Sequence, residues 1–225
     1  MRRDGGVIRH PSPNFGPRRH ARPPSLVVLH YTEMRSARAA LDRLCAPDAE
    51  VSAHYLVGRD GTIWQLVDED RRAWHAGAGQ WRSCDDVNSA SIGIELDNDG
   101  QSPFSAPLMA ALEPLLAGIL NRWCIEPGGV IAHSDMAPTR KSDPGPRFDW
   151  RRLAQSGLSV WPDHSGDSAH PLAESLDRIG YPPGTEPVRL AAFRLRFRPG
   201  ATGPECATDR ALADALARNC LAFEK

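Results

Sequence analysis

Residues 132–146 read AHSDMAPTRKSDPGP, and the rest of the chain can be placed around them. The stretch contains His133, Lys141 and Asp143, and it ends in Pro-Gly-Pro, which cannot continue a helix or a central strand. The apolar residues 129–132 come directly before it and predict a short buried strand. His133 would then lie at the carboxyl end of a strand, where α/β proteins expose functional residues.

A second apolar run ends in a histidine in the same way. Residues 26–32 read LVVLHYT, so His30 follows four aliphatic residues. If the two strands are neighbours, His30 and His133 meet, and Asp143 completes a set of two histidines and one aspartate. A catalytic zinc needs three protein ligands and one open position, which this set offers. Taken singly, each histidine is better explained as a strand end with a local hydrogen bond; the repeated pattern favours the metal site.

A carboxylate interrupts a third apolar run, SIGIEL, at residues 91–96. Burying Glu95 among isoleucine and leucine is costly unless the carboxylate has a partner, and such groups are candidate general acids or bases with a raised pKa. A glutamate that points to solvent from an edge strand explains this stretch about equally well.

Five fragments together carry a resemblance to a known family. They are LHYTE (29–33), SAHYLVGRDGTIWQLV (52–67), RRAWHAG (71–77), SIGIELDN (91–98) and AHSDMAPTRKSDPGP (132–146). In this order they closely resemble the family 2 N-acetylmuramoyl-L-alanine amidases, in the AmpD and AmiD branch that cuts muropeptides. The resemblance covers roughly residues 10 to 162, and animal peptidoglycan recognition proteins and T7 lysozyme are more distant relatives on the same fold.

The resemblance implies one Zn²⁺ per chain, bound by His30, His133 and Asp143, with Glu95 and Lys141 as catalytic residues. It further implies hydrolysis of the amide between N-acetylmuramic acid, or its 1,6-anhydro form, and L-alanine of the peptidoglycan stem peptide, in cell-wall recycling or turnover. Two alternatives stay open: a receptor that binds muropeptides without cutting them, and a general zinc peptidase. Receptors on this fold characteristically lack a metal ligand, and this chain lacks none.

The candidates for substrate contact are Tyr31, Trp74, His75 and Asn88. The last three fall in the long connection between residues 68 and 90, and long irregular segments inside compact domains are usually functional. His54 lies within an expected strand and is better explained as a sheet histidine than as a fourth ligand, because the zinc needs its last position open.

Composition limits the remaining partners and the compartment. The net charge of −1 gives no reason to expect nucleic acid. Five widely spaced cysteines without a C-x-x-C pair indicate reduced thiols. No apolar signal segment or membrane span is recognisable, so we expect a cytoplasmic protein without a membrane anchor. The oligomeric state cannot be predicted.

We expect an α/β fold with a mixed central β-sheet flanked by helices, followed by a small C-terminal three-helix module. The predicted divisions are an N-terminal arm (1–24), the amidase domain (25–160) and the module (170–225). Phe15 is expected to pin the arm. The remaining expected elements are a helix capped by Ser36, a hairpin over 52–67 with a turn at Asp60-Gly61, a helix over 105–123 disturbed at Pro114, a short helix over 149–155, and three helices over 171–179, 188–197 and 208–221. The module either binds peptidoglycan or only docks on the main domain.

Overall fold

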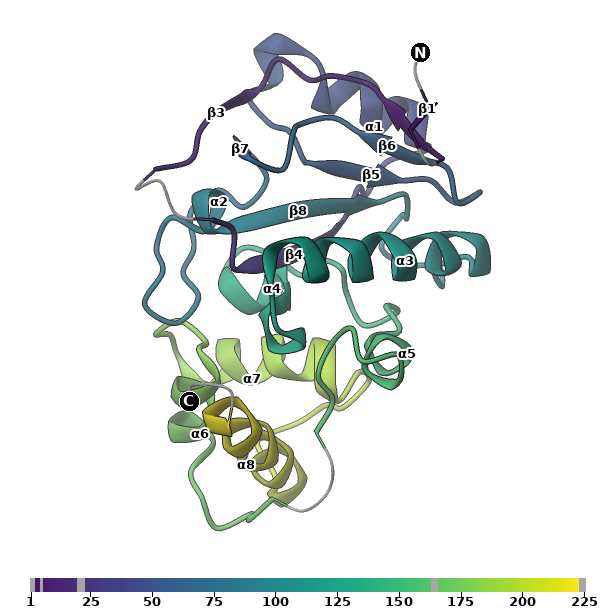
Figure 1. Ribbon diagram of the computed structural model, residues 1–225. Helices are drawn as coiled ribbons and strands as arrows, with labels where there is room; N and C mark the ends of the chain where they lie inside the picture. Colours follow the sequence, from purple (N-terminus) through teal and green to yellow (C-terminus); the bar gives the residue numbers. More distant parts are fainter. Residues whose placement is uncertain (1–2, 5, 20–22, 163–165, 223–225) are drawn as a thin grey trace.

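The computed structural model describes residues 3–4, 6–19, 23–162 and 166–222. These residues form a seven-stranded mixed sheet in the order β1-β2-β6-β5-β8-β4-β9 and a small two-stranded sheet, β3-β7. Figure 1 shows the strands in one half of the molecule and the last three helices in the other, with α4 between them. The arrangement confirms the predicted mixed sheet flanked by helices.

The functional strands are the three adjacent ones at one side of the sheet. β4 (Leu26–Tyr31) pairs in parallel with β8 (Ser91–Leu96) and with β9 (Val130–Ala132), so their carboxyl ends lie at the same edge. His30 is the register partner of Glu95. α4 (His133–Met136) begins at the next residue after β9. The neighbouring strands predicted from the two histidine-terminated runs are therefore confirmed.

Alternation along these strands separates two layers. Val27 and Leu29 of β4 and the isoleucines of β8 pack on α3 (Ala106–Trp123) and α5 (Trp150–Gln155). Leu26 and Val28 face the opposite side, where the C-terminal helices cover them. His30 follows in the same alternation. Ser91, Gly93 and Glu95, as register partners of Leu26, Val28 and His30, continue this second face.

Serine side chains cap the starts of two helices, and the cap at Ser36 confirms the prediction. Ser36 caps α1 (Ala37–Leu44) and Ser105 caps α3, each hydroxyl accepting a backbone N–H three residues later. The hairpin pairs β5 (Tyr55–Val57) with β6 (Ile63–Gln65), and Gly61 takes a positive φ at its turn. α3 continues through Pro114, whose missing N–H removes one helical hydrogen bond.

The N-terminal arm adds short strands to both sheets. β1 (Arg3–Asp4) pairs with β2 (Val7–Arg9), β2 pairs in parallel with β6, and β3 (Phe15–Pro17) pairs with β7 (Arg71–Ala73).

Polar contacts, and not Phe15, hold the arm. The Phe15 side chain is 42% exposed, so the prediction that it pins the arm is wrong. The buried Asn14 amide instead donates to the carbonyls of Ala46 and Val51. Arg18 donates to the carbonyls of Ser89, Ser91 and Glu69, at 2.7, 3.0 and 2.7 Å. The arm therefore fixes the loop that enters β8.

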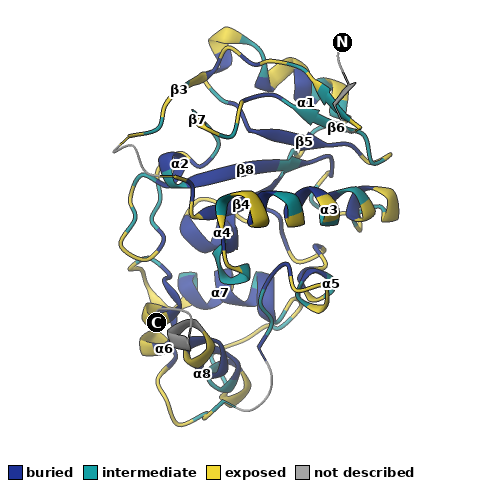
Figure 2. Ribbon diagram, viewed as in Figure 1, coloured by how far each residue is buried: buried dark blue, intermediate teal, exposed yellow. Residues whose placement is uncertain are grey.

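The C-terminal helices share a core with the sheet. They are α6 (Leu172–Ile179), α7 (Glu186–Phe197) and α8 (Ala207–Ala222), close to the predicted ranges. These helices contribute Leu172, Leu176, Ile179, Leu190, Phe193, Phe197, Leu212 and Leu216 to one buried cluster that also contains Val28, Ile131 and Met136. α7 is largely buried along its length (Figure 2).

A buried ion pair crosses this interface. Asp135, fully buried in α4, accepts from Arg196 Nη1 at 2.6 Å, from Tyr181 Oη at 2.7 Å and from the backbone N–H of Ala132 at 2.9 Å. Arg196 also donates to the carbonyl of Val130, and its guanidinium lies 4.0 Å from the centre of the Trp150 ring. The histidine-bearing turn is thus joined directly to α7.

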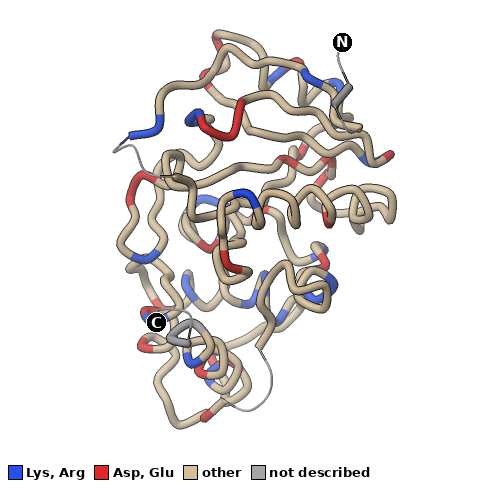
Figure 3. Tube along the Cα trace, in the orientation of Figure 1, with Lys and Arg blue, Asp and Glu red and all other residues tan. Residues whose placement is uncertain are grey.

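Charges of both signs are spread along the whole trace (Figure 3). In the described part of the chain, every helix is too short or too polar to cross a bilayer. The four cysteines whose side chains are described, Cys45, Cys84, Cys124 and Cys206, form no disulfide, as predicted.

Replacing Arg196 tests the importance of the buried pair. We expect Arg196→Met to lower the free energy of unfolding by about 3–5 kcal/mol, because it leaves a buried carboxylate without its cation. Arg38→Ala is the control, since Arg38 and Asp42 form an exposed pair, and its loss should stay below about 1 kcal/mol. Urea unfolding measures both variants, and equal losses would show that the buried pair is not special.

Candidate active site

Two imidazoles and one carboxylate converge at the carboxyl end of β4 and β9. His30 Nδ1 lies 2.9 Å from His133 Nδ1, and both nitrogens lie 3.0 Å from Asp143 Oδ2. The three side chains are buried, and among the described residues they form a group that could hold a metal ion. The triangle is near the size of one face of a tetrahedral zinc site, whose ligand atoms stand about 3.3 Å apart. The residues fit a metal ion in size and in chemistry.

Each ligand is positioned by a different element. His30 is the penultimate residue of β4, and His133 is the first residue of α4. Asp143 comes from the following loop, where its carbonyl accepts the N–H of Ser134 at 3.0 Å. That bond ties the aspartate loop to the turn that holds His133, so the two ligands from one sequence motif move together.

The protonation states suit metal binding. Burial and the neighbouring His133 lower the pKa of His30 to about 4, so its imidazole is neutral near neutral pH. Burial opposes the charge on Asp143, but hydrogen bonds from His133 and His30 outweigh it and hold the pKa of Asp143 well below its usual value. A metal therefore meets a neutral His30 imidazole and an ionised Asp143 carboxylate, without displacing a proton from the aspartate.

Glu95 stands beside this group at the wall of a cavity. Burial, and then the charge of Asp143, raise the pKa of Glu95 well above its usual value, while Lys141 opposes the rise. Glu95 Oε2 has no hydrogen-bond partner among the described residues. The alternative of a solvent-facing edge glutamate is wrong, because β8 lies between β5 and β4. Lys141 is exposed and lines the same cavity.

The cavity has a volume of about 400 Å³. Of the predicted substrate contacts, Tyr31, Trp74 and His75 line it, and the Tyr31 hydroxyl lies 3.0 Å from Ser142 Oγ. Sequence reasoning missed Arg43 and Arg140, which also line it. Arg140 could have been predicted, because it directly precedes Lys141 in the same motif. Arg43 could not, because it lies on α1, far from the motif in the sequence, and only folding brings it to the cavity.

Asn88 takes another place than the predicted one. It is 8% exposed, does not line the cavity, and its Oδ1 accepts the backbone N–H groups of His75 and Ala76 at 3.0 and 2.9 Å. His54 is fully buried in the sheet, where its Nδ1 accepts the N–H of Gly93 and its Nε2 lies 3.0 Å from the carbonyl of Arg71. His54 therefore stands outside the metal-binding group, as predicted.

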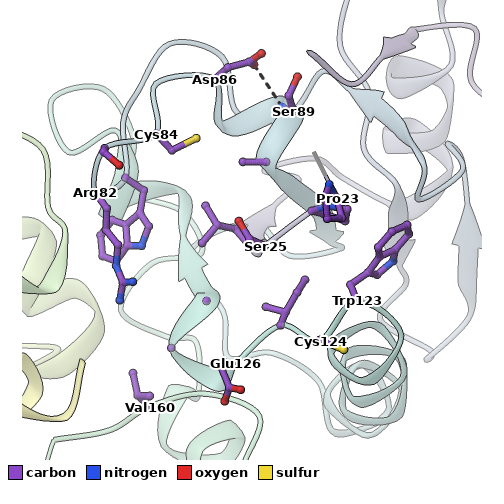
Figure 4. Close-up of a pocket in the computed structure, with 18 of the residues that line it drawn as sticks. Pro23, Ser25, Arg82, Cys84, Asp86, Ser89, Trp123, Cys124, Glu126 and Val160 are labelled. Carbon is purple, nitrogen blue, oxygen red and sulfur yellow. Dashed lines mark hydrogen bonds between the residues drawn. The ribbon is translucent and has the colours of Figure 1, made fainter. Parts of the chain in front are cut away.

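A second cavity, of about 750 Å³, lies at the opposite ends of the strands (Figure 4). Its wall includes Ser25 and Gly129, which directly precede β4 and β9, and Ser89, which lies two residues before β8. Trp123 and Glu126 also line it. It contains none of the three ligand residues, Glu95 or Lys141. The chemistry of the site belongs to the smaller cavity.

Comparisons with known proteins agree with this geometry. Residues 20–146 match the family model described as N-acetylmuramoyl-L-alanine amidase. The N-acetylmuramoyl-L-alanine amidase AmiD of Escherichia coli K12 is 38% identical, over 85% of this chain and 81% of that protein. The 1,6-anhydro-N-acetylmuramyl-L-alanine amidase AmpD of the same organism is 34% identical, over 66% of this chain and 90% of that protein.

Solved structures extend the likeness to the C-terminal helices. AmiD from E. coli, in complex with the substrate anhydro-N-acetylmuramic acid-L-Ala-D-gamma-Glu-L-Lys, superposes with a TM-score of 0.79 at 37% identity, covering 89% of this chain and 91% of that one. AmpDh3 from Pseudomonas aeruginosa, in complex with anhydromuramic pentapeptide, gives a TM-score of 0.78 at 30% identity, covering 89% and 94%. The chain therefore belongs to the N-acetylmuramoyl-L-alanine amidase family and is an enzyme of the class that its motifs predicted.

Proposed function

We propose that this enzyme uses one Zn²⁺ to hydrolyse the amide between the lactyl group of N-acetylmuramic acid, or of its 1,6-anhydro form, and L-alanine of the stem peptide. The observation that carries the proposal is the buried triangle of His30, His133 and Asp143 with Glu95 at its side. The family membership and the substrates named for the similar structures of AmiD and AmpDh3 support it.

His30, His133 and Asp143 would hold the zinc. When bound, Zn²⁺ supplies Lewis acidity to the scissile carbonyl and lowers the pKa of a bound water toward ~7. Glu95 takes a proton from the attacking water and returns it to the nitrogen of the leaving L-alanine, so the C–N bond breaks as the amine is protonated. Lys141, on the same loop as Asp143, aims its ammonium at the oxyanion that forms on the carbonyl.

The rim of the cavity suits an acidic stem peptide. Arg43, Arg140 and Lys141 line it, and a γ-linked glutamate in such a peptide leaves one carboxylate free. Arginine binds carboxylates with charge-assisted hydrogen bonds. Tyr31, Trp74 and His75 stay the proposed contacts for the sugar and the first residues of the peptide.

The domain organisation, the role of the C-terminal helices and the cellular location of this enzyme stay predictions. The domain boundaries at 25–160 and 170–225 are one; the shared core favours a C-terminal module that folds with the main domain. The role of this module in binding peptidoglycan is another, which sedimentation with purified sacculi measures. A role in cell-wall recycling is also a prediction. So is the cytoplasmic location, which fractionation of the host cells measures.

The central test is cleavage of a purified anhydro-muropeptide, followed by mass spectrometry. We expect release of the free stem peptide in the presence of zinc, and loss of this release after chelation and in Glu95→Gln. Binding without cleavage under every metal condition would favour the muropeptide receptor. A stem peptide without sugar is the matched substrate control: equal cleavage of it would favour a general peptidase.

Lys141 should contribute to the rate more than to substrate binding. We expect Lys141→Ala to lower kcat by ~10² to 10³, the cost of removing one oxyanion stabiliser. Arg147→Ala is the control, because Arg147 is an exposed cation on the same segment that does not line the cavity. Full turnover in Lys141→Ala would remove this residue from the mechanism.

Glu95 should cost the metal-free enzyme stability. The pKa of Glu95 is raised in the folded state, so the buried carboxyl is tolerated while it is protonated. The free energy of unfolding therefore falls as the pH rises from the usual pKa of glutamate through the raised pKa. We expect metal-free Glu95→Gln to unfold at a higher temperature than the wild type above neutral pH, and the gap to close below the usual pKa of glutamate. The exposed Glu126 provides the control variant Glu126→Gln. A gap that does not change with pH would contradict the assignment.

A further inference from the structure

His75 stands directly behind one of the ligand histidines. Its Nδ1 lies 3.0 Å from His30 Nε2, the ring nitrogen of His30 that points away from the other two ligands. Its own Nε2 lies 3.3 Å from Ser91 Oγ, and the Ser91 hydroxyl donates to the carbonyl of Val87 at 2.5 Å. These contacts form one line from the metal-binding group into the start of β8.

The protons on this line can be assigned in only one way once a metal is bound. His30 Nδ1 faces His133 and Asp143, so it must offer its lone pair, and the ring carries its proton on Nε2. The partner of that N–H must be an acceptor, so His75 is neutral, with a bare Nδ1 and a proton on Nε2. The Nε2–H then donates to Ser91 Oγ, whose own proton goes to Val87. Every donor in the line meets an acceptor.

The backbone next to His75 does the same for the other ligand. His133 Nε2 lies 2.9 Å from the carbonyl of Ala76, which accepts its proton and leaves Nδ1 free for the metal. Consecutive residues therefore orient both ligand imidazoles. Asn88 Oδ1 accepts the N–H groups of these same two residues, which fixes the segment.

Gly93 makes the position of the His75 ring possible. A Cβ atom built at Gly93 would lie 2.3 Å from His75 Cγ, closer than any two such atoms can approach. The ring thus lies flat over the strand, on the sheet face between Ser91 and Glu95. Gly93, in the run SIGIEL, has no side chain and therefore leaves room for the imidazole of His75.

We propose that His75 is a positioning residue: as a neutral hydrogen-bond acceptor, it holds His30 in the tautomer that binds zinc, and Asn88 holds His75 and Ala76 in place. Hydrogen bonds of this kind to ligand histidines typically change metal affinity 10–100-fold. A neutral acceptor adds no negative charge, so the site keeps the Lewis acidity of a dication with a single carboxylate ligand. The proposal rests on the proposed zinc function.

A pair of nearly isosteric variants tests the role of the acceptor. His75→Asn can place Oδ1 where Nδ1 was, whereas His75→Leu fills the same space without an acceptor. Zinc affinity is measured on full-length protein by competition with a chromogenic chelator, with circular dichroism as the folding control. We expect His75→Leu to lose affinity by ~10- to 100-fold and His75→Asn to recover most of the loss.

Spectroscopy tests the same assignment without any substitution. Long-range ¹H–¹⁵N correlation spectra of the zinc-loaded wild type report the proton position on each imidazole. We expect Nε2–H on His30, His133 and His75, and an unprotonated, hydrogen-bonded Nδ1 on His75. A cationic His75, or one with its proton on Nδ1, would overturn the proposal.

The outcomes distinguish failure of the proposed role of His75 from failure of the proposed zinc amidase function. Failure of the wild type to bind zinc contradicts the proposed function. Tight binding by the wild type and by His75→Leu alike leaves the zinc amidase intact and overturns the role of His75. Equal losses in His75→Asn and His75→Leu likewise overturn it, because they would assign the effect to ring packing.

Discussion

The buried carboxylate of Asp135 connects the active-site turn to the rest of the molecule. It stands two residues after His133 and accepts hydrogen bonds from the backbone of its own turn, from Tyr181 and from Arg196. A charge in this position is stable only while all its partners are present. The position of His133 therefore depends on helices that begin almost 40 residues later in the chain. In this enzyme the C-terminal helices are part of the structure of the site, whatever they bind.

Around that connection, the site is built in two layers. The inner layer, His30, His133 and Asp143, comes from three elements that the parallel pairing of β4 and β9 brings together. The outer layer, His75, Ala76 and Asn88, lies in the long connection before β8 and sets the orientation of the inner one. The connection is irregular because it must place the Ala76 carbonyl beside the ring of His133 and the His75 imidazole beside the ring of His30.

Local patterns were enough to predict the inner layer and the helix ends. An apolar run followed by histidine identified both strand ends, and Ser36 identified one helix start, because each signal lies within a few residues of its effect. Contacts between distant residues could not be predicted in this way. Asp135 and Arg196 are 61 residues apart, and neither residue shows by itself that it is buried with the other.

The errors have the same origin. Phe15 was expected to pin the N-terminal arm, but it is exposed, and hydrogen bonds from Asn14 and Arg18 hold the arm instead. Asn88 was expected at the substrate because it lies in a long loop, yet its amide accepts two backbone N–H groups inside the protein. In both cases the hydrogen bonds of buried backbone, which a sequence does not display, decided the outcome.

The contact between Arg196 and Val130 has one more consequence. Among the described residues, β9 is the last strand of the sheet, so one row of its backbone groups has no strand of this part of the chain to pair with. Such edges are templates on which another chain can add a strand. The Arg196 guanidinium, on α7, donates a hydrogen bond to the Val130 carbonyl in this strand. A chain cut before residue 170 would therefore leave the edge strand β9 exposed, directly before the turn that holds His133. Pairing of this edge with another copy would then compete with folding of the shortened enzyme.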